Sequence, residues 1–319
     1  MQILQFHPIL KRALWGGRRL GTVLSKPLGP EPDYAESWDV ADLPGDISVV
    51  QNGNLHGKTL RELVEQYPED LLGQQSRTGR FPLLIKYLDA THKLSIQVHP
   101  SRAMAARRPE VTTGKAETWV ILEAEPGSRV YAGLKPGVDE QILRKAATTP
   151  EIVDCLHSYE VQPGDCISLR PGTVHAIGAG LLIAEVQEPN NVTYRLSDWG
   201  RINGHGKPRE LHLELGLEAT NFALGPVDPV TPRLLEQGHE ELVRSEHFVL
   251  HRHFGPGIWK PHQDNRPHVL MLLAGTGSLP ASANESALTR GQTVVLPAVH
   301  DDIPIHLSPD AILLDAWVE

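Results

Sequence analysis

The segment 94–100 reads LSIQVHP, in which apolar and polar side chains alternate with the two-residue period of a β-strand. Ser95, Gln97 and His99 are therefore expected on one face of that strand, with the apolar side chains between them on the other. A face that carries a hydroxyl, an amide and an imidazole is typical of the wall of a polar cavity. This pattern is the first sign of a functional site in the chain.

Two further side chains extend this candidate site. Glu117 stands at the start of the apolar run 119–122, where a carboxylate needs an opposite charge to offset its desolvation. His175 follows a Pro-Gly turn, which can aim a side chain inward without regular structure. Together with Gln97 and His99, these residues offer nitrogen and oxygen donors that suit a divalent metal, and zinc is the first candidate.

Each candidate ligand also has an explanation that needs no metal. A lone histidine such as His99 is more commonly buried with a hydrogen bond to backbone. Glu117 could pair with Lys115, and His175 could be an exposed loop residue. Gln97 is a weak ligand that could instead orient a metal-bound water or a substrate hydroxyl.

A cation with a chemical role is expected at Arg195, which shares a predicted strand face with Thr193. Arginine is always charged, so an Arg195 that points into a cavity could stabilise an enediolate or clamp a phosphate. The alternative for Arg195 is a surface ion pair with Asp198.

Four motifs occur in order along the chain, namely QVHP at 97–100, KAETW at 115–119, PGTVHAIG at 171–178 and VTYRLSDWGR at 192–201. In this order, and in a chain of this length, they resemble the short bacterial form of type I mannose-6-phosphate isomerase, a family of the cupin superfamily. The resemblance extends from WGGRRL at 15–20 nearly to the C-terminus.

The resemblance implies a zinc-dependent isomerase that interconverts mannose 6-phosphate and fructose 6-phosphate by proton transfer through an enediolate. One Zn2+ per chain is implied, with the ligands Gln97, His99, Glu117 and His175. Catalytic roles are implied for Arg195, Lys115 and Glu185. The substrate phosphate is assigned to Arg201, with Ser95, Lys86 and Lys115 as further candidates.

The general base stays open between Glu185, Lys115 and a ligand-bound water. Lys115 could serve only if its pKa were lowered by burial or by the metal. Asn191 replaces an acidic residue that is proposed as the proton carrier in some members of the family. An ion pair with Arg195 is the structural alternative for Glu185.

Other functions remain open at the level of sequence. A related cupin isomerase or epimerase could act on another phosphosugar, such as glucose 6-phosphate, with the same residues. A metal-dependent dioxygenase is less favoured, because such enzymes prefer a metal shell dominated by histidines. A non-catalytic sugar-binding cupin would need neither the metal nor the inward arginine.

Composition limits the partners. The 319 residues carry a net charge of -9, which argues against nucleic acid or an anionic membrane surface as the main partner. No run approaches the roughly 20 apolar residues that span a bilayer, and no signal peptide is apparent. Cys155 and Cys166 are expected to be reduced thiols of a cytoplasmic protein. We expect a monomer or a weak homo-oligomer.

Many short elements must position these residues. Helices are predicted at 59–67, 101–108, 138–147, 150–157 and 209–220. Strands are predicted at 81–88, 94–99, 118–123, 129–132, 166–169, 181–187 and 192–196. After a proline-rich linker at 225–232, strands are predicted at 248–254, 268–273, 293–296, 303–307 and 312–317. Residues 1–57 indicate irregular strands and turns.

The fold class is predicted to be mainly β, with two cupin-like jelly-roll barrels and helical insertions in the N-terminal part. A catalytic, metal-binding domain is placed at 1–225 and a degenerate cupin domain at 226–319. A faint repeat supports this division, because a Gly turn, a strand and a Pro turn precede both His175 and His300.

A second group of histidines lies in the C-terminal part. His247, His251 and His253 alternate along a predicted strand. We expect them to line a partly exposed face of the C-terminal domain rather than to form a site.

Overall fold

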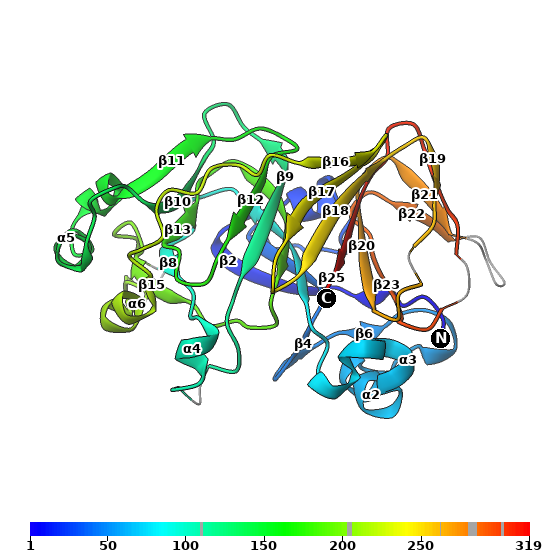
Figure 1. The fold of residues 1–319 in the computed structure, drawn as a ribbon. Helices are drawn as coiled ribbons and strands as arrows, with labels where there is room; N and C mark the ends of the chain where they lie inside the picture. Colours follow the sequence, from blue (N-terminus) through cyan, green and yellow to red (C-terminus); the bar gives the residue numbers. More distant parts are fainter. Residues whose placement is uncertain (109–110, 203–205, 262, 280–285, 301–302) are drawn as a thin grey trace.

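The computed structural model describes residues 1–319 except 109–110, 203–205, 262, 280–285 and 301–302. The described chain is mainly β, as predicted, and its larger sheets lie in layers with short helices around them (Figure 1). Among the described residues, no helix is long and apolar enough to cross a membrane.

The N-terminal half contains two large antiparallel sheets. The first has the order β12-β9-β14-β7-β3-β2, with bounds β2 (Ile9–Gly17), β3 (Tyr34–Val40), β7 (Leu84–Ala90), β9 (Glu117–Ala124), β12 (Cys166–Leu169) and β14 (Leu181–Gln187). The second has the order β11-β10-β13-β8-β15, with bounds β8 (Ile96–Val98), β10 (Arg129–Leu134), β11 (Leu156–Glu160), β13 (His175–Ile177) and β15 (Tyr194–Ser197). Trp119 and Ile183 of the first sheet share a buried cluster with Val130 of the second, so the two sheets pack face to face.

The C-terminal part repeats this two-sheet arrangement. Its larger sheet has the order β16-β17-β18-β25-β20-β23, with bounds β16 (Arg233–Glu236), β17 (His239–Arg244), β18 (Val249–Phe254), β20 (His268–Ala274), β23 (Thr293–Leu296) and β25 (Ile312–Trp317). Its smaller sheet has the order β19-β24-β21-β22, with bounds β19 (Gly257–Trp259), β21 (Thr276–Leu279), β22 (Ser286–Thr289) and β24 (Ile305–Leu307). Leu272 and Leu313 of the larger sheet pack with Ile305 of the smaller one.

The outer faces of the two larger sheets meet in a shared core. Tyr87 and Val120 from the N-terminal half belong to the same buried cluster as Met271 and Leu314 from the C-terminal half. Near the N-terminus, Leu4 pairs with Val295 of β23 through two backbone hydrogen bonds of 2.9 Å. The two halves are therefore joined by apolar burial as well as by the linker.

Short helices and minor strands complete the described chain. The α-helices are α1 (Arg19–Thr22), α2 (Leu60–Gln66), α3 (Pro68–Leu72), α4 (Arg102–Ala105), α5 (Glu140–Ala146) and α6 (Leu213–Ala219). The 3-10 helices are η1 (Gly53–Leu55), η2 (Gly73–Thr78) and η3 (Pro150–Cys155), and the minor strands are β1 (Phe6–His7), β4 (Asp42–Leu43), β5 (Asp46–Ile47) and β6 (Val49–Val50). The helix predicted at 59–67 is confirmed with its capping box, in which Thr59 and Glu62 each satisfy a backbone N–H of the other.

Two predictions about elements differ from the structure. The helix predicted at 150–157 is a 3-10 helix that ends at Cys155, because Leu156 pairs with Leu134 and extends the chain into β11. Residues 1–57 were predicted to hold irregular strands and turns, and the structure shows two long regular strands there, β2 and β3. Strand β2 lies at the sheet edge, where most of its side chains are partly exposed and show no clear alternation, so only pairing with β3 identifies it.

The prediction for the C-terminal histidines is also wrong. His251 and His253 are buried and project from one face of β18, opposite Asp315 and Leu313 of β25. Leu313 lies in the core between the C-terminal sheets. His247 precedes the strand and lies apart from them, with its Nδ1 3.2 Å from Oε2 of Glu188. Sequence alternation gave the shared face of His251 and His253, but the packing of the second sheet decided that this face is interior.

A buried charged histidine fastens β20 to β25. Nδ1 of His268 lies 2.8 Å from Oδ1 of Asp315, and its Nε2 lies 3.3 Å from Oδ1 of Asp264. Burial opposes the charge, yet the carboxylates of Asp315 and Asp264 raise the pKa of His268 to about 9. Since this pKa exceeds the unfolded value near 6.5, the protonated histidine stabilises the fold fully below that pH.

We predict that His268→Asn destabilises the protein more at pH 6 than at pH 9.5. The stabilisation by His268 should fade as pH rises through about 9. The loss of unfolding free energy in the variant should therefore be about 3 kcal/mol larger at pH 6 than at pH 9.5. Urea unfolding of both proteins at the two pH values measures it, with the exposed His306→Asn as the control. An equal loss at both pH values would contradict a charged His268.

Candidate active site

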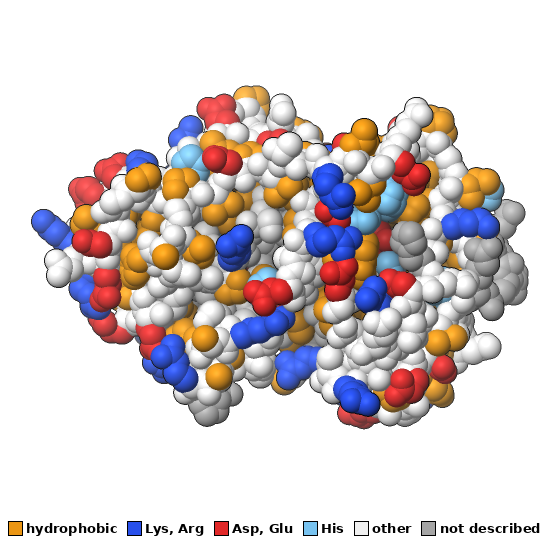
Figure 2. Space-filling model, in the orientation of Figure 1, with side chains coloured by type: hydrophobic (Ala, Val, Ile, Leu, Met, Phe, Trp, Pro, Cys, Tyr) orange, Lys and Arg blue, Asp and Glu red, His pale blue; other side chains and the backbone are white. Residues whose placement is uncertain are grey.

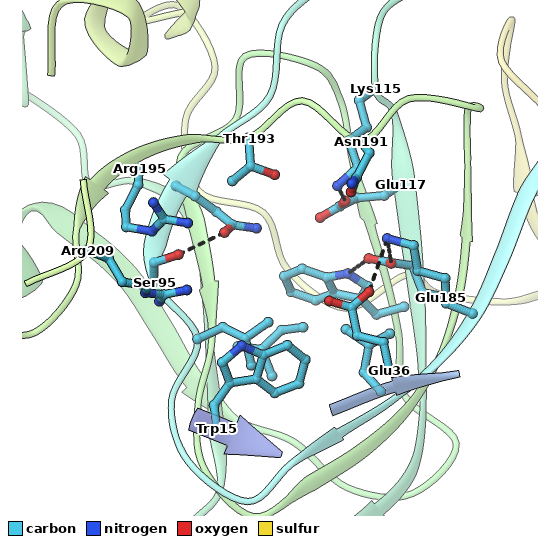
Figure 3. A pocket seen from close by; sticks show the side chains of 16 residues that line it. Trp15, Glu36, Ser95, Lys115, Glu117, Glu185, Asn191, Thr193, Arg195 and Arg209 are labelled. Atoms are coloured by element: carbon cyan, nitrogen blue, oxygen red, sulfur yellow. Dashed lines mark hydrogen bonds and ion pairs between the residues drawn. The ribbon is translucent and has the colours of Figure 1, made fainter. Parts of the chain in front are cut away.

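A cavity of about 130 Å³ opens between the two N-terminal sheets. Figure 3 shows its walls, on which carboxylates and Lys115 lie across from two arginines. The side chains that line it are Trp15, Glu36, Lys86, Leu88, Leu94, Ser95, Gln97, Lys115, Glu117, Trp119, Ile177, Glu185, Asn191, Thr193, Arg195 and Arg209. The cavity thus collects residues from strands that are far apart in sequence.

The alternation predicted for residues 94–99 is confirmed. Ser95 and Gln97 line the cavity, whereas Ile96 and Val98 are fully buried in a separate apolar cluster behind β8. Oγ of Ser95 donates a hydrogen bond of 3.0 Å to Oε1 of Gln97. The strand therefore presents its polar face to the cavity because its apolar face is held in the core.

Three of the predicted ligands converge beside this cavity. Nε2 of His99 lies 3.2 Å from Oε2 of Glu117, and Nε2 of His175 lies 3.1 Å from Oε1 of the same carboxylate. All three side chains are no more than 2% exposed. His175 is opposite Gln97 in the register of β13 and β8, and the Gln97 amide nitrogen lies 3.3 Å from Nε2 of His175. The structure brings the four predicted ligands together.

Backbone carbonyls orient both histidine rings through Nδ1. Nδ1 of His99 lies 3.0 Å from the carbonyl oxygen of Val192, and Nδ1 of His175 lies 2.9 Å from that of Thr173. A carbonyl oxygen only accepts, so each Nδ1 is the donor. Burial and the nearby charge of Lys115 lower the pKa of His99 to about 3, so at neutral pH its Nε2 presents a lone pair.

The resulting donor set fits a divalent cation. The Nε2 atoms of the two imidazoles and a buried carboxylate face a common point, and such a convergence favours a positive charge between them. The outward N–H of each ring is held by backbone, which is the usual support of a metal-bound histidine. The nitrogen and oxygen donors suit zinc and related ions.

Lys115 supplies positive charge to this donor set in the structure. Its Nζ lies 2.8 Å from Nε2 of His99 and 2.8 Å from Oε2 of Glu117. Burial opposes ionisation of Glu117, but Lys115 and the two histidines hold its pKa well below the usual value. The salt bridge that we considered as the alternative for Glu117 is therefore present, and its ammonium stands where a metal ion would balance the same carboxylate.

A second buried charge cluster forms the adjoining wall. Nζ of Lys86 lies 3.3 Å from Oε2 of Glu185 and 3.5 Å from Oε2 of Glu36. The indole N–H of Trp119 donates to Oε1 of Glu185 at 3.1 Å. Burial raises the pKa of Glu185, although Lys86 counteracts it. Lys86 is thus engaged with carboxylates, and the partner of Glu185 is Lys86 rather than Arg195.

The opposite wall is cationic. Arg195 comes from β15, where it lies opposite Gln97 of β8 in register, and its Nη1 donates to the carbonyl oxygen of Glu210 at 2.8 Å. Burial and the charge of Arg209 lower the pKa of Arg195, which remains protonated. Figure 3 shows the two guanidinium groups beside Ser95. This wall is suited to an anion.

Asp198 holds Arg209 in place. Nε of Arg209 donates to Oδ2 of Asp198 at 2.8 Å, and its Nη2 donates to Oδ1. Arg201 also donates to Oδ1 of Asp198, at 2.5 Å, and to the backbone carbonyl of Lys93. Arg201 lines a neighbouring cavity rather than this one. The structure therefore places Arg209 on the cavity wall where the family pattern suggested Arg201.

Sequence reasoning did not predict that several side chains line the cavity, namely Trp15, Glu36, Trp119, Thr193 and Arg209. Trp15 precedes Gly16, whose backbone passes so close to β3 that a Cβ there would lie 2.5 Å from the carbonyl carbon of Tyr34. For Trp15, this neighbouring glycine is the one available signal in the sequence, because a glycine beside a tryptophan indicates tight strand packing. No local pattern distinguishes Glu36 or Arg209 from a surface charge.

Comparison with known proteins identifies relatives over nearly the whole chain. The family model for the catalytic domain of type I phosphomannose isomerase matches residues 3–116. The mannose-6-phosphate isomerase of Streptococcus mutans is 34% identical, with 90% of each chain covered, and that of Bacillus subtilis named ManA is 32% identical, with 92% of each covered.

Solved structures agree with this family. The mannose 6-phosphate isomerase structure from Bacillus subtilis matches with a TM-score of 0.90 at 27% identity and covers 99% of each chain. A phosphomannose isomerase variant from Salmonella typhimurium matches with a TM-score of 0.81 at 14% identity over the full length of both chains, which shows a common fold.

We predict that Lys86→Met destabilises the protein by about 3–5 kcal/mol at pH 8, because it leaves Glu185 and Glu36 without their cation. The pKa of Glu185, already raised, should rise further. A group with a raised folded pKa loses its stabilising effect as pH increases, so the deficit should shrink toward pH 5. Urea unfolding measures this difference.

The matched control for this prediction is the double variant Lys86→Met/Glu185→Gln. It removes the cation together with its nearest carboxylate and should recover part of the stability lost at pH 8. A deficit that is equal at pH 5 and pH 8, with no recovery in the double variant, would show that Lys86 acts through packing alone.

Proposed function

The chain belongs to the type I phosphomannose isomerase family, and we propose that it interconverts mannose 6-phosphate and fructose 6-phosphate with the aid of zinc. The observation that carries the proposal is the convergence of His99, Glu117 and His175 beside a cavity whose far wall holds Arg195 and Arg209. A metal-binding donor set and an anion-binding wall in one cavity suit an isomerase that acts on a phosphorylated sugar.

The residues that would hold the ion are His99, Glu117 and His175, with Gln97 as the fourth ligand. A half-turn of the Gln97 amide would exchange its nitrogen, now 3.3 Å from Nε2 of His175, for an oxygen. When bound, zinc would supply Lewis acidity toward the oxygens of the substrate. Lys115, whose ammonium contacts the same atoms, would then turn toward the cavity that it lines.

The substrate is oriented by the charge asymmetry of the cavity. The phosphate lies against Arg209 and Ser95, which leaves C1 and C2 of the open-chain sugar at the carboxylate wall. Arg195 stands between these ends, opposite Gln97 in register, where it stabilises the negative charge that develops on the enediolate oxygens. Arg201 supports Arg209 through their common partner Asp198.

Glu185 is the proposed proton carrier. Its carboxylate takes the proton from C2 of mannose 6-phosphate and returns it to C1, while the hydroxyl proton passes from O2 to O1, so no co-reactant is required. Burial raises its pKa toward the working range of a base. The indole of Trp119 fixes one carboxylate oxygen at 3.1 Å, which aims the carboxylate at the cavity.

The finer architecture follows the same family. We infer that each pair of packed sheets is a cupin-type jelly roll, with a catalytic unit at 1–225 and a degenerate unit at 226–319. Cys155 and Cys166 are free and buried, which agrees with a cytoplasmic location. We retain a monomer or a weak homo-oligomer as the expected assembly.

We predict that the protein isomerises mannose 6-phosphate in a coupled assay, that chelation removes the activity and that zinc restores it. Glu117→Gln should lower zinc affinity at least about 100-fold and lower kcat in proportion to metal loss. Glu123→Gln, a carboxylate change on the same strand at a surface ion pair with Arg290, should retain both. A zinc-loaded wild-type protein without turnover would refute the proposed function.

We predict different kinetic effects for the two arginines of the cavity. Arg209→Gln should raise KM for mannose 6-phosphate about 10- to 100-fold with a smaller change in kcat, because a phosphate contact is made equally in ground and transition states. Arg195→Ala should lower kcat about 100-fold or more. The surface variant Arg129→Gln is the control. Equal losses of kcat in both variants would contradict the division of roles.

A further inference from the structure

A second group of potential metal ligands lies in the C-terminal half. His239, His251 and His253, here called the histidine triad, offer ring nitrogens that all lie within 4.8 Å of one another. His251 and His253 are buried and His239 is partly exposed. Figure 2 shows pale-blue histidine side chains at the surface in this part of the molecule. The proposed isomerase reaction uses none of the three.

The register of β17 and β18 assembles the triad. His239 lies directly opposite His253, and Glu241 lies opposite His251. Nε2 of His239 is 2.8 Å from Nδ1 of His251, and the rings of His239 and His253 stack with centroids 4.1 Å apart. Because alternate residues of paired strands share a face, the three imidazoles project together into the space between the C-terminal sheets.

Carboxylates and indoles surround the triad. Nδ1 of His239 lies 3.5 Å from Oε1 of Glu236, and Nε2 of His251 lies 3.5 Å from Oε2 of Glu241. These carboxylates stand behind the ring nitrogens that face away from the triad, which is the arrangement that orients metal-bound histidines. Trp317 packs against His251 at 4.7 Å and Trp259 against His253 at 4.9 Å between ring centroids.

We propose that the histidine triad binds a divalent transition metal of the zinc class, in a site separate from the candidate active site. One ion can be reached by all three rings, since nitrogens 2.0–2.1 Å from a tetrahedral ion stand about 3.3 Å apart, a small widening from the 2.8 Å between Nε2 of His239 and Nδ1 of His251. Such an ion would tie β17 to β18.

The two metal sites are independent in space. His251 and His253 face the interior of the C-terminal sheets, whereas His99 and His175 lie between the N-terminal sheets. The shared apolar core separates the two interiors. Loss of one site should therefore leave the metal content of the other unchanged.

The test counts zinc in untagged protein that has been stripped with a chelator, dialysed against a zinc buffer and analysed for bound metal. Wild-type protein should hold two equivalents per chain. His239→Gln should hold one, His99→Ala should hold one, and the double variant should hold none. His306→Gln, an exposed histidine of the same half on β24, is the matched control and should hold two. Circular dichroism confirms that each variant is folded.

A single equivalent in the wild type that disappears in His99→Ala would overturn the proposal. Two equivalents that persist in His239→Gln would overturn it as well. If His239→Gln does not fold, X-ray absorption of zinc-loaded His99→Ala decides, because the remaining ion should show three nitrogen ligands near 2.0 Å. The count needs no activity, so its outcome is independent of the proposed isomerase function.

Discussion

The burial of the Glu117 carboxylate is the constraint on which the candidate active site depends. A carboxylate that is 1% exposed loses its hydration, and only a nearby positive charge can replace it. Backbone carbonyls accept hydrogen bonds from Nδ1 of both neighbouring histidines, so each ring turns its Nε2 toward this carboxylate. Lys115 supplies this positive charge in the structure, and a divalent metal would supply it as well.

The other charged residues of the cavity are paired with other groups, so the positive charge beside Glu117 comes from Lys115. Lys86 is committed to Glu185 and Glu36, so it does not neutralise Glu117 directly. Arg195 and Arg209 lie across the cavity, and Arg209 is anchored by Asp198 outside it. A protein with a net charge of -9 thereby has a cationic wall inside its cavity, since local geometry rather than the overall field decides where an anion can bind.

The layered sheets make this arrangement rigid. The six-stranded N-terminal sheet buries apolar side chains on both faces, with one face in the cavity-side core and the other in the core shared with the C-terminal half. Strand alternation then places each polar side chain at a fixed point, because a slip of one residue would move apolar groups into water. The C-terminal half uses the same rule to gather His239, His251 and His253 from paired strands.

The sequence by itself determined the polar face of residues 94–99, the four motifs that indicate the family, and most strands and helices with strong periodicity or caps, such as Thr59 with Glu62. It did not determine β2, the interior position of His251, or the replacement of Arg201 by Arg209 on the cavity wall. Those features depend on which strands pair and which sheets pack, and such long-range contacts leave no local pattern because the partner lies far away along the chain.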